Sequence, residues 1–80
     1  MKKSIHSSEQ NELLSLLRAK RKASGLSQES LARRLGRSQS FVSKYESGEL
    51  RLDLVQLREI CQALGITLSK FVREYEGRLL

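Results

Sequence analysis

The feature that most constrains the fold is a pair of short helical patterns joined through one glycine, in the stretch SQESLARRLGRSQSFVSKYESG at residues 27–48. Ser27 is suited to cap the first helix, which ends at Leu35, and Ser38 is suited to cap the second. Gly36 supplies the positive φ of a sharp turn, and the two residues after it leave little room for a loop. The two helices must therefore meet at a tight turn.

The second of these helices has two faces of different chemistry. At about 100° per residue, its apolar side chains share one arc and short polar side chains occupy the opposite arc. The apolar arc holds Phe41, Val42 and Tyr45, and the polar arc holds Gln39, Ser40, Ser43, Lys44 and Ser47. Serine is a middling helix former, and a face that needs only solubility more often carries Glu and Lys. We interpret the polar arc as a surface that recognises a binding partner.

A further helix is expected before this pair, over about residues 9–23, with Ser7 or Ser8 as its cap. Its acidic residues stand in the first turn and its basic residues in the last, which suits the helix dipole. Residues 1–8 are polar and lack periodicity, so they are expected to form a flexible N-terminus. His6 lies there without packed neighbours, and we assign it no role.

Two helices are expected after the pair. Asp53 and Gln56 form a capping box for the first of them. Its apolar stripe is expected to contain Leu54, Leu57, Ile60, Cys61 and Leu64. The second is short, and its own chain is expected to cover only half of it, which makes it the natural dimer surface. The apolar residues expected at that surface are Phe71, Val72, Tyr75 and Leu79.

These patterns define the fold class. The chain has no proline, only four aromatic residues (two Phe and two Tyr) and few β-branched runs, so it favours helices over strands. Its 80 residues make one domain at most, with a thin core. We therefore expect an all-α, compact five-helix domain over residues 9–80, with the helix pair at 27–47 as its central motif.

The net charge of +6 is concentrated in one half of the chain. Residues 18–44 contain eight basic residues opposed only by Glu29, which leaves +7 there and −1 elsewhere. Such a block indicates a polyanionic partner, with nucleic acid first and an anionic membrane surface second. The alternative is a solvated basic surface without a partner.

Composition also excludes several classes of protein. The chain contains no apolar run long enough to cross a membrane, so we expect an intracellular protein without a membrane span. Cys61 is the only cysteine, so no internal disulfide can form, and one Cys with one His cannot build a zinc site. We expect Cys61 to be a small buried hydrophobe. No nucleophile stands beside a base, so neither an enzyme nor a cofactor is expected.

The stretch LSQESLARRLGRSQSFVSKYESG resembles the lambda-repressor-like, or XRE-type, helix-turn-helix family of DNA-binding proteins. The family pattern places Gln at the start of the second helix, Leu-Ala within it, Gly at the turn, an aliphatic-Ser pair, and Glu-x-Gly at the end of the third helix. The matching residues are Gln28, Leu31, Ala32, Gly36, Val42, Ser43, Glu46 and Gly48. With the later LREICQALGITLSKFV, the resemblance covers about residues 17–72. Many relatives have a proline after the glycine, where this chain has ELRLD.

The resemblance implies a role for each site residue. The third helix would lie in the major groove, where Gln39, Ser40 and Lys44 match reading positions and Ser43 lies within reach of a base or phosphate. The phosphate contacts implied are those of Gln28, Arg37, Ser38 and, more weakly, Arg51. Arg21 and Glu46 are implied to pair between the first and third helices, with Arg21 also reaching the DNA backbone. Arg33 and Arg34 would add positive field rather than contacts.

The function expected from this resemblance is that of a sequence-specific double-stranded DNA-binding transcriptional regulator, a repressor or autoregulator. It would act as a homodimer on a palindromic operator, in the cytoplasm and nucleoid of a bacterial or phage system. The alternative is an antitoxin-like module that binds a protein partner through the fourth or fifth helix and the tail REYEGRLL, with DNA binding secondary.

Overall fold

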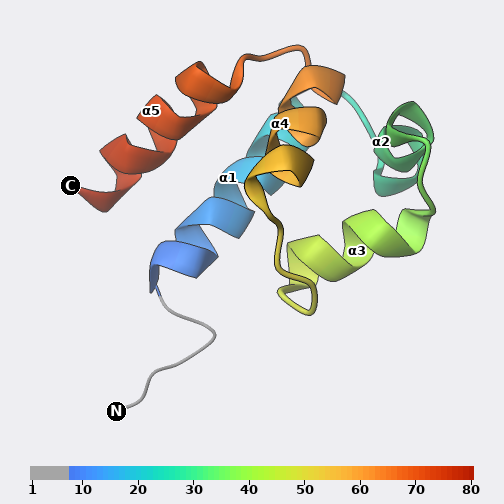
Figure 1. Cartoon of the computed structure of the whole chain (residues 1–80), viewed down its shortest axis with the longest axis horizontal. Helices are drawn as coiled ribbons and strands as arrows, with labels where there is room; N and C mark the ends of the chain where they lie inside the picture. The colour runs from blue at the N-terminus through green and yellow to red at the C-terminus, as the bar shows by residue number, and fades with distance from the viewer. Residues whose placement is uncertain (1–7) are drawn as a thin grey trace.

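The computed structural model describes residues 8–80, which form five α-helices without a strand (Figure 1). The helices are α1 (Ser8–Ala23), α2 (Gln28–Leu35), α3 (Gln39–Ser47), α4 (Leu54–Ala63) and α5 (Leu68–Leu79). The predicted all-α class and the five-helix architecture are therefore confirmed. Ser8 is the first residue of α1, so this helix begins one residue before the expected start at Glu9. The expectations for His6, for a cap at Ser7 and for the flexibility of residues 1–7 lie outside the described residues.

Local hydrogen bonds fix where the helices begin. The Ser27 hydroxyl accepts the backbone N–H of Ser30 at 3.0 Å, which caps α2. Asp53 and Gln56 form the expected capping box at the start of α4, with reciprocal bonds of 2.7 and 2.9 Å. Thr67 caps α5 by accepting from the backbone N–H three residues later. These bonds join residues close in sequence, which is why the sequence predicts the helix starts well.

The core lies where all five helices meet. Its fully buried side chains come from every helix: Leu17, Leu31, Val42, Tyr45, Ile60, Cys61 and Phe71. Cys61 is thus packed as a small core residue, and burial raises the pKa of its thiol to about 11. With few large side chains available, the domain depends on this one cluster for its hydrophobic stabilisation.

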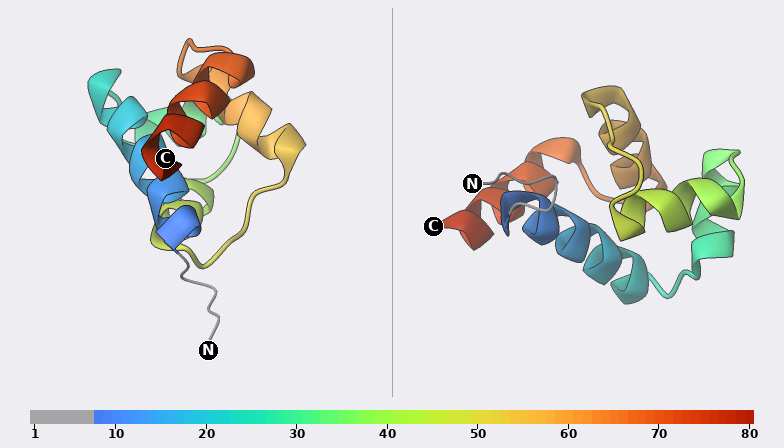
Figure 2. Two further views of the ribbon diagram at one scale, coloured as in Figure 1. Left: turned by 90° about the vertical axis from the view of Figure 1, so that its left-hand side faces the viewer. Right: turned by 90° about the horizontal axis from the view of Figure 1, so that it is seen from below.

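The expected exposure of Phe71 at a dimer surface is wrong, because this ring is 0% exposed and lies in the core. The physical reason is the position of α5, which runs beside α1 in both views of Figure 2 and covers its own apolar side against that helix. Polar contacts tie the same two helices together. Lys20 Nζ lies 2.7 Å from Glu74 Oε1, and the Tyr75 hydroxyl donates to the Glu9 carbonyl at 3.0 Å. Val72 and Tyr75 are half-buried, and only Leu79 and Leu80 expose large apolar area at this helix.

Leu54 was expected in the buried stripe of α4 and is 66% exposed, beside Val55 at 67%. At about 100° per residue, Leu54 lies at the edge of the arc that Ile60 and Cys61 occupy. Its helical phase therefore does not distinguish it from buried residues. It lies in the first turn of α4, where both Leu54 and Val55 are exposed.

Candidate nucleic-acid interface

The polar arc of α3 is on the surface, at the end of the molecule away from α5 and the C-terminus (Figure 1). Gln39, Ser40, Ser43, Lys44 and Ser47 are all exposed. On the opposite side of the helix, Val42 and Tyr45 are 0% exposed. Burial of the apolar arc therefore fixes the rotation of α3 about its axis and turns every polar-arc residue outward.

The turn between α2 and α3 sets the angle at which α3 is presented. Gly36 has φ of 68°, in the left-handed region that favours glycine. Its backbone N–H bonds to the Arg33 carbonyl, and the Arg37 N–H bonds to the Ala32 carbonyl at 2.9 Å. Ala32 is 2% exposed, and its small side chain lets α3 approach α2 closely. The junction is therefore short and held by two backbone hydrogen bonds.

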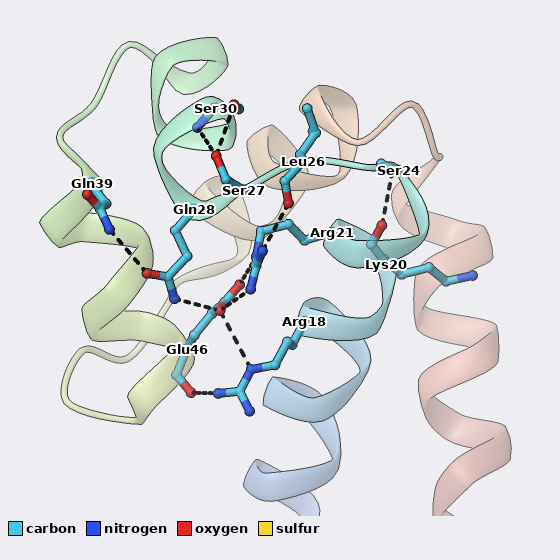
Figure 3. Close-up of polar contacts among 10 residues, drawn as sticks. All are labelled: Arg18, Lys20, Arg21, Ser24, Leu26, Ser27, Gln28, Ser30, Gln39 and Glu46. Carbon is cyan, nitrogen blue, oxygen red and sulfur yellow. Dashed lines mark hydrogen bonds and ion pairs between the residues drawn. The ribbon is translucent and has the colours of Figure 1, made fainter.

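The carboxylate of Glu46 is the centre of a polar cluster beneath α3 (Figure 3). Arg21 donates to it through two nitrogens, Nε to Oε2 at 2.7 Å and Nη2 to Oε1 at 3.0 Å. The third nitrogen of Arg21, Nη1, donates to the Leu26 carbonyl at 2.9 Å. Arg21 is 8% exposed and Glu46 is 3% exposed. The pair is a buried, forked, charge-assisted contact that joins α1 to α3.

Arg21 directs all three of its nitrogens to acceptors within the protein and is 8% exposed. One N–H on Nη1 and one on Nη2 are not used by these bonds, so the contact of Arg21 with the DNA backbone stays a prediction. Arg18 is better placed, since its side chain is 49% exposed.

Arg18 is the member of this cluster that the sequence analysis missed. Its Nη2 donates to the Glu46 carbonyl at 3.2 Å, near the end of α3, and its Nε lies 3.6 Å from Glu46 Oε1. The first of these bonds satisfies a carbonyl in the last turn of α3, which the helix itself leaves open. Arg18 stands three residues before Arg21 and so shares its helical face, which is the signal that would have found it.

Gln28 and Gln39 extend the cluster from the core to the surface (Figure 3). Gln28 Nε2 donates to Glu46 Oε1 at 2.9 Å. Gln39 Nε2 in turn donates to Gln28 Oε1 at 3.5 Å, a long hydrogen bond. The first residue of α2, the first residue of α3 and the buried carboxylate are thereby connected through side chains alone.

Opposing influences set the pKa values in this cluster. Burial alone would raise the pKa of Glu46, but hydrogen bonds from Arg21 and Gln28 and the charges of Arg21 and Arg18 outweigh it and lower the pKa below its usual range. The hydrogen bond to Glu46 raises the pKa of Arg21 and outweighs its desolvation. The cluster is therefore ionised at neutral pH, with one negative charge facing two positive charges.

The remaining phosphate candidates stand around the start of α3. The Arg37 guanidinium lies 4.4 Å from the centre of the Phe41 ring, a cation–π contact that holds it at the surface. Ser38 has the backbone conformation of an N-cap, but its hydroxyl makes no capping bond to α3. The expected capping role of its side chain is wrong. Arg51 lies in the exposed connection between α3 and α4.

Arg34 also departs from expectation. It is not merely a source of positive field, because its Nη1 donates to the Ala63 carbonyl at 3.1 Å, at the end of α4. The bond joins α2 to α4 and gives the Ala63 carbonyl, at the end of α4, a hydrogen-bond donor. Arg33 Nη2 lies 3.9 Å from Glu29 Oε2 on the exposed side of α2, in an i,i+4 pair.

Within residues 8–80, no group of three or more His, Cys, Asp or Glu side chains is placed to hold a metal ion. None of the helices described is both long and apolar enough to cross a membrane.

Comparison of the sequence with known proteins finds one family and several relatives. A family model described as helix-turn-helix matches residues 17–71. The chain is 38% identical over 60 residues to an uncharacterized transcriptional regulator in the ATPase CF(0) region of Rhodospirillum rubrum, covering 75% of this chain and 56% of that protein. The chain thus spans little more than half of that relative's length. It is 34% identical over 61 residues to the control protein C.MunI of a Mycoplasma species, covering 76% of this chain and 82% of that protein.

Solved structures agree with these sequence relatives. An XRE-family like protein from Pseudomonas syringae pv. tomato matches with a TM-score of 0.85 and 40% identity, over 92% of this chain and 90% of that one. The clp gene regulator ClgR from Corynebacterium glutamicum matches with a TM-score of 0.77 and 25% identity, over 89% of this chain and 91% of that one. Both matches extend over about nine tenths of each chain.

Proposed function

The chain belongs to the XRE-type helix-turn-helix family of transcriptional regulators, and from that premise we propose that it recognises a specific double-stranded DNA sequence by laying α3 in the major groove. The observation that carries the proposal is the polar arc of α3, which is wholly exposed while the other side of the helix is fixed in the core. The helices form a platform that presents the hydrogen-bonding side chains of this arc to the surface.

Base recognition is assigned to the polar arc. The Gln39 amide can donate to N7 and accept from N6 of adenine, and the Lys44 ammonium suits the O6 and N7 acceptors of guanine. Ser40 discriminates weakly because its hydroxyl both donates and accepts, and Ser43 lies next to it on the same arc. Each well-made bidentate contact discriminates by about 1–3 kcal/mol.

Affinity is assigned to contacts with the phosphate backbone. Gln28, Arg37 and Ser38 flank the start of α3, where free backbone N–H groups and the helix dipole favour an anion. Arg51 and the exposed half of Arg18 add positive charge at the other end of α3. This part of the binding free energy falls steeply with salt.

The regulator is proposed to act as a homodimer on a palindromic operator, with half-site centres about one helical turn apart. The proposed apolar part of the dimer surface lies at the C-terminal end of α5. It comprises exposed Leu79 and Leu80 with half-buried Val72 and Tyr75, and it does not include Phe71. Repression or autoregulation is the proposed role, which the name of the relative C.MunI, a control protein, supports.

The test is selection from a random duplex DNA library at fixed, near-physiological salt, because specificity is interpretable only when salt is held constant. We expect an enriched two-fold symmetric sequence. No enrichment by protein that circular dichroism shows to be folded would refute the proposal, and an asymmetric single site would refute the dimer. The same patch at Leu79 and Leu80 could instead hold a protein partner, as in an antitoxin-like module, and a stable monomer in light scattering favours that second function.

A further inference from the structure

The starting observation is a contact between two side chains across the start of α3. The guanidinium carbon of Arg37 lies 4.4 Å from the centre of the Phe41 ring, within the range of a cation–π interaction. The Arg37 N–H bonds to the Ala32 carbonyl at 2.9 Å. The Phe41 N–H bonds to the Ser38 carbonyl at 3.1 Å, so the main chain is fixed at both residues. The ring therefore determines where the flexible Arg37 side chain points.

The ring of Phe41 is held in turn by the core. It meets the Tyr45 ring edge to face, with centroids 5.5 Å apart and an interplanar angle of 67°. Tyr45 is 0% exposed, Phe41 is half-buried and Arg37 is exposed. The contacts thus lead from a fixed ring in the core, through a second ring, to a cation at the surface.

Arg37 lies between two hollows of the surface. It lines one of them with Ser38 and Phe41, at the start of α3, and the other with Glu59 of α4. Within residues 8–80, no ion pair engages Arg37. A guanidinium released from the ring would be attracted to the Glu59 carboxylate across the second hollow. The ring contact therefore keeps this charge on the side of α3.

We infer that Phe41 is a positioning residue for DNA binding, whose ring holds the Arg37 guanidinium at the start of α3 for a backbone phosphate and keeps it away from Glu59. The inference rests on the proposed phosphate contact of Arg37 and adds the group that directs it. A guanidinium stacked on a ring through its face keeps the N–H groups in its plane for phosphate oxygens. Because the side chain is ordered before DNA arrives, less conformational entropy is lost on binding.

The decisive test is a double-mutant cycle between Phe41→Leu and Arg37→Ala, because a cycle isolates the coupling between two side chains. Leucine keeps apolar bulk against the core and offers no ring face. With Arg37 present, Phe41→Leu should weaken DNA binding by about 2- to 5-fold, which corresponds to the strength of an exposed cation–π contact. In the Arg37→Ala background, the same change should weaken binding by less than about 1.5-fold.

Binding of the purified protein is measured over a series of salt concentrations on two duplexes, the sequence enriched by selection and an unrelated duplex of equal length. Phosphate contacts carry no base information, so the loss caused by Phe41→Leu should be the same on both duplexes. Arg37→Ala should reduce the slope of log K against log salt by about 0.9, the value for one phosphate contact. Phe41→Leu should reduce this slope only where Arg37 is present, whereas a purely structural role of the ring would not change it.

The matched control is Phe41→Tyr, which keeps the ring face and should bind DNA within about 1.5-fold of the unaltered protein. Phe41→Met, which also lacks a ring, replaces the leucine variant if circular dichroism shows that variant to be unfolded. Equal loss for Phe41→Leu in both backgrounds, or equal loss in the tyrosine and leucine variants, overturns the inference. Unchanged affinity and slope in Arg37→Ala overturn it as well, because Arg37 would then contact no phosphate. If the unaltered protein binds no duplex DNA, the proposed function has failed instead, and the two failures are thus distinguished.

Discussion

Replacement of Arg21 by alanine tests how much of the domain's stability depends on the buried pair. The substitution removes both bonds to Glu46 and the bond to the Leu26 carbonyl, and it leaves a carboxylate that is 3% exposed without its main partner. Breaking a buried pair by removal of one partner costs about 3–5 kcal/mol. Because Arg18 and Gln28 still face Glu46, we expect the lower end, about 3 kcal/mol.

That loss is large for a domain of this size. At about 0.05–0.15 kcal/mol per residue, 80 residues give a total stability of roughly 4–12 kcal/mol. Urea unfolding followed by far-UV circular dichroism measures the change, and the dependence of the free energy on urea should remain the same. Arg33→Ala is the matched control, since Arg33 lies 3.9 Å from Glu29 with both side chains more than 70% exposed, and its removal should change stability by about 0.5 kcal/mol or less.

The result that refutes the reasoning is equal loss in the two arginine variants, at about 1 kcal/mol or less, because the cluster would then behave as a surface pair. A second arm separates charge from packing. In the double variant Arg21→Met with Glu46→Leu, no unpaired charge is left in the interior, so it should be more stable than Arg21→Ala.

Three further predictions follow from the same contacts. The Tyr45 hydroxyl is buried without a hydrogen-bond partner among residues 8–80, and burial raises its pKa. Because Tyr45→Phe removes this unbonded polar group, the melting temperature should stay equal or rise. A clear decrease would show that the hydroxyl is bonded. Folding lowers the pKa of Glu46 from 4.5, so the ionised carboxylate contributes fully to the free energy of unfolding above pH 4.5, and this contribution is lost as the pH falls through the lower pKa of the folded state. The free energy of unfolding should therefore decrease on acidification below pH 4.5, and it should decrease less in Glu46→Gln. Equal pH dependence of the two proteins would contradict this prediction. Gln39→Ala and Lys44→Ala should each flatten base preference while non-specific DNA affinity changes less, whereas Arg33→Ala should leave preference intact; unchanged preference in Gln39→Ala would show that another element reads the DNA.

Much of the fold was predictable because its signals are local. The capping serine at Ser27, the capping box at Asp53 and the left-handed glycine at Gly36 each act over a few residues, and the structure confirms all three. The exposed arc of α3 was likewise predictable, since a helix with apolar residues on one side must turn the other side to water. Family resemblance added roles to residues whose chemistry alone allowed several.

The errors arose where burial depends on distant parts of the chain. Phe71 and Leu54 both lie on apolar arcs, but the first is buried in the core and the second is 66% exposed. Helical periodicity repeats every turn and carries no information on how far along the axis a neighbouring helix extends. Ser38 shows a related limit, since its backbone adopts the capping conformation while its hydroxyl makes no capping bond.

The sequence by itself determined the helices, their order, the tight turn between α2 and α3 and the polar arc that α3 presents, because hydrogen bonding and side-chain periodicity within a few residues suffice for these. Only the tertiary structure decided how the arc is supported. Glu46 and Arg21 are 25 residues apart, and Gln39 and Gln28 are 11 apart. Which end of each amide faces its neighbour depends on packing that brings these side chains together around one buried carboxylate, and no local pattern encodes that orientation.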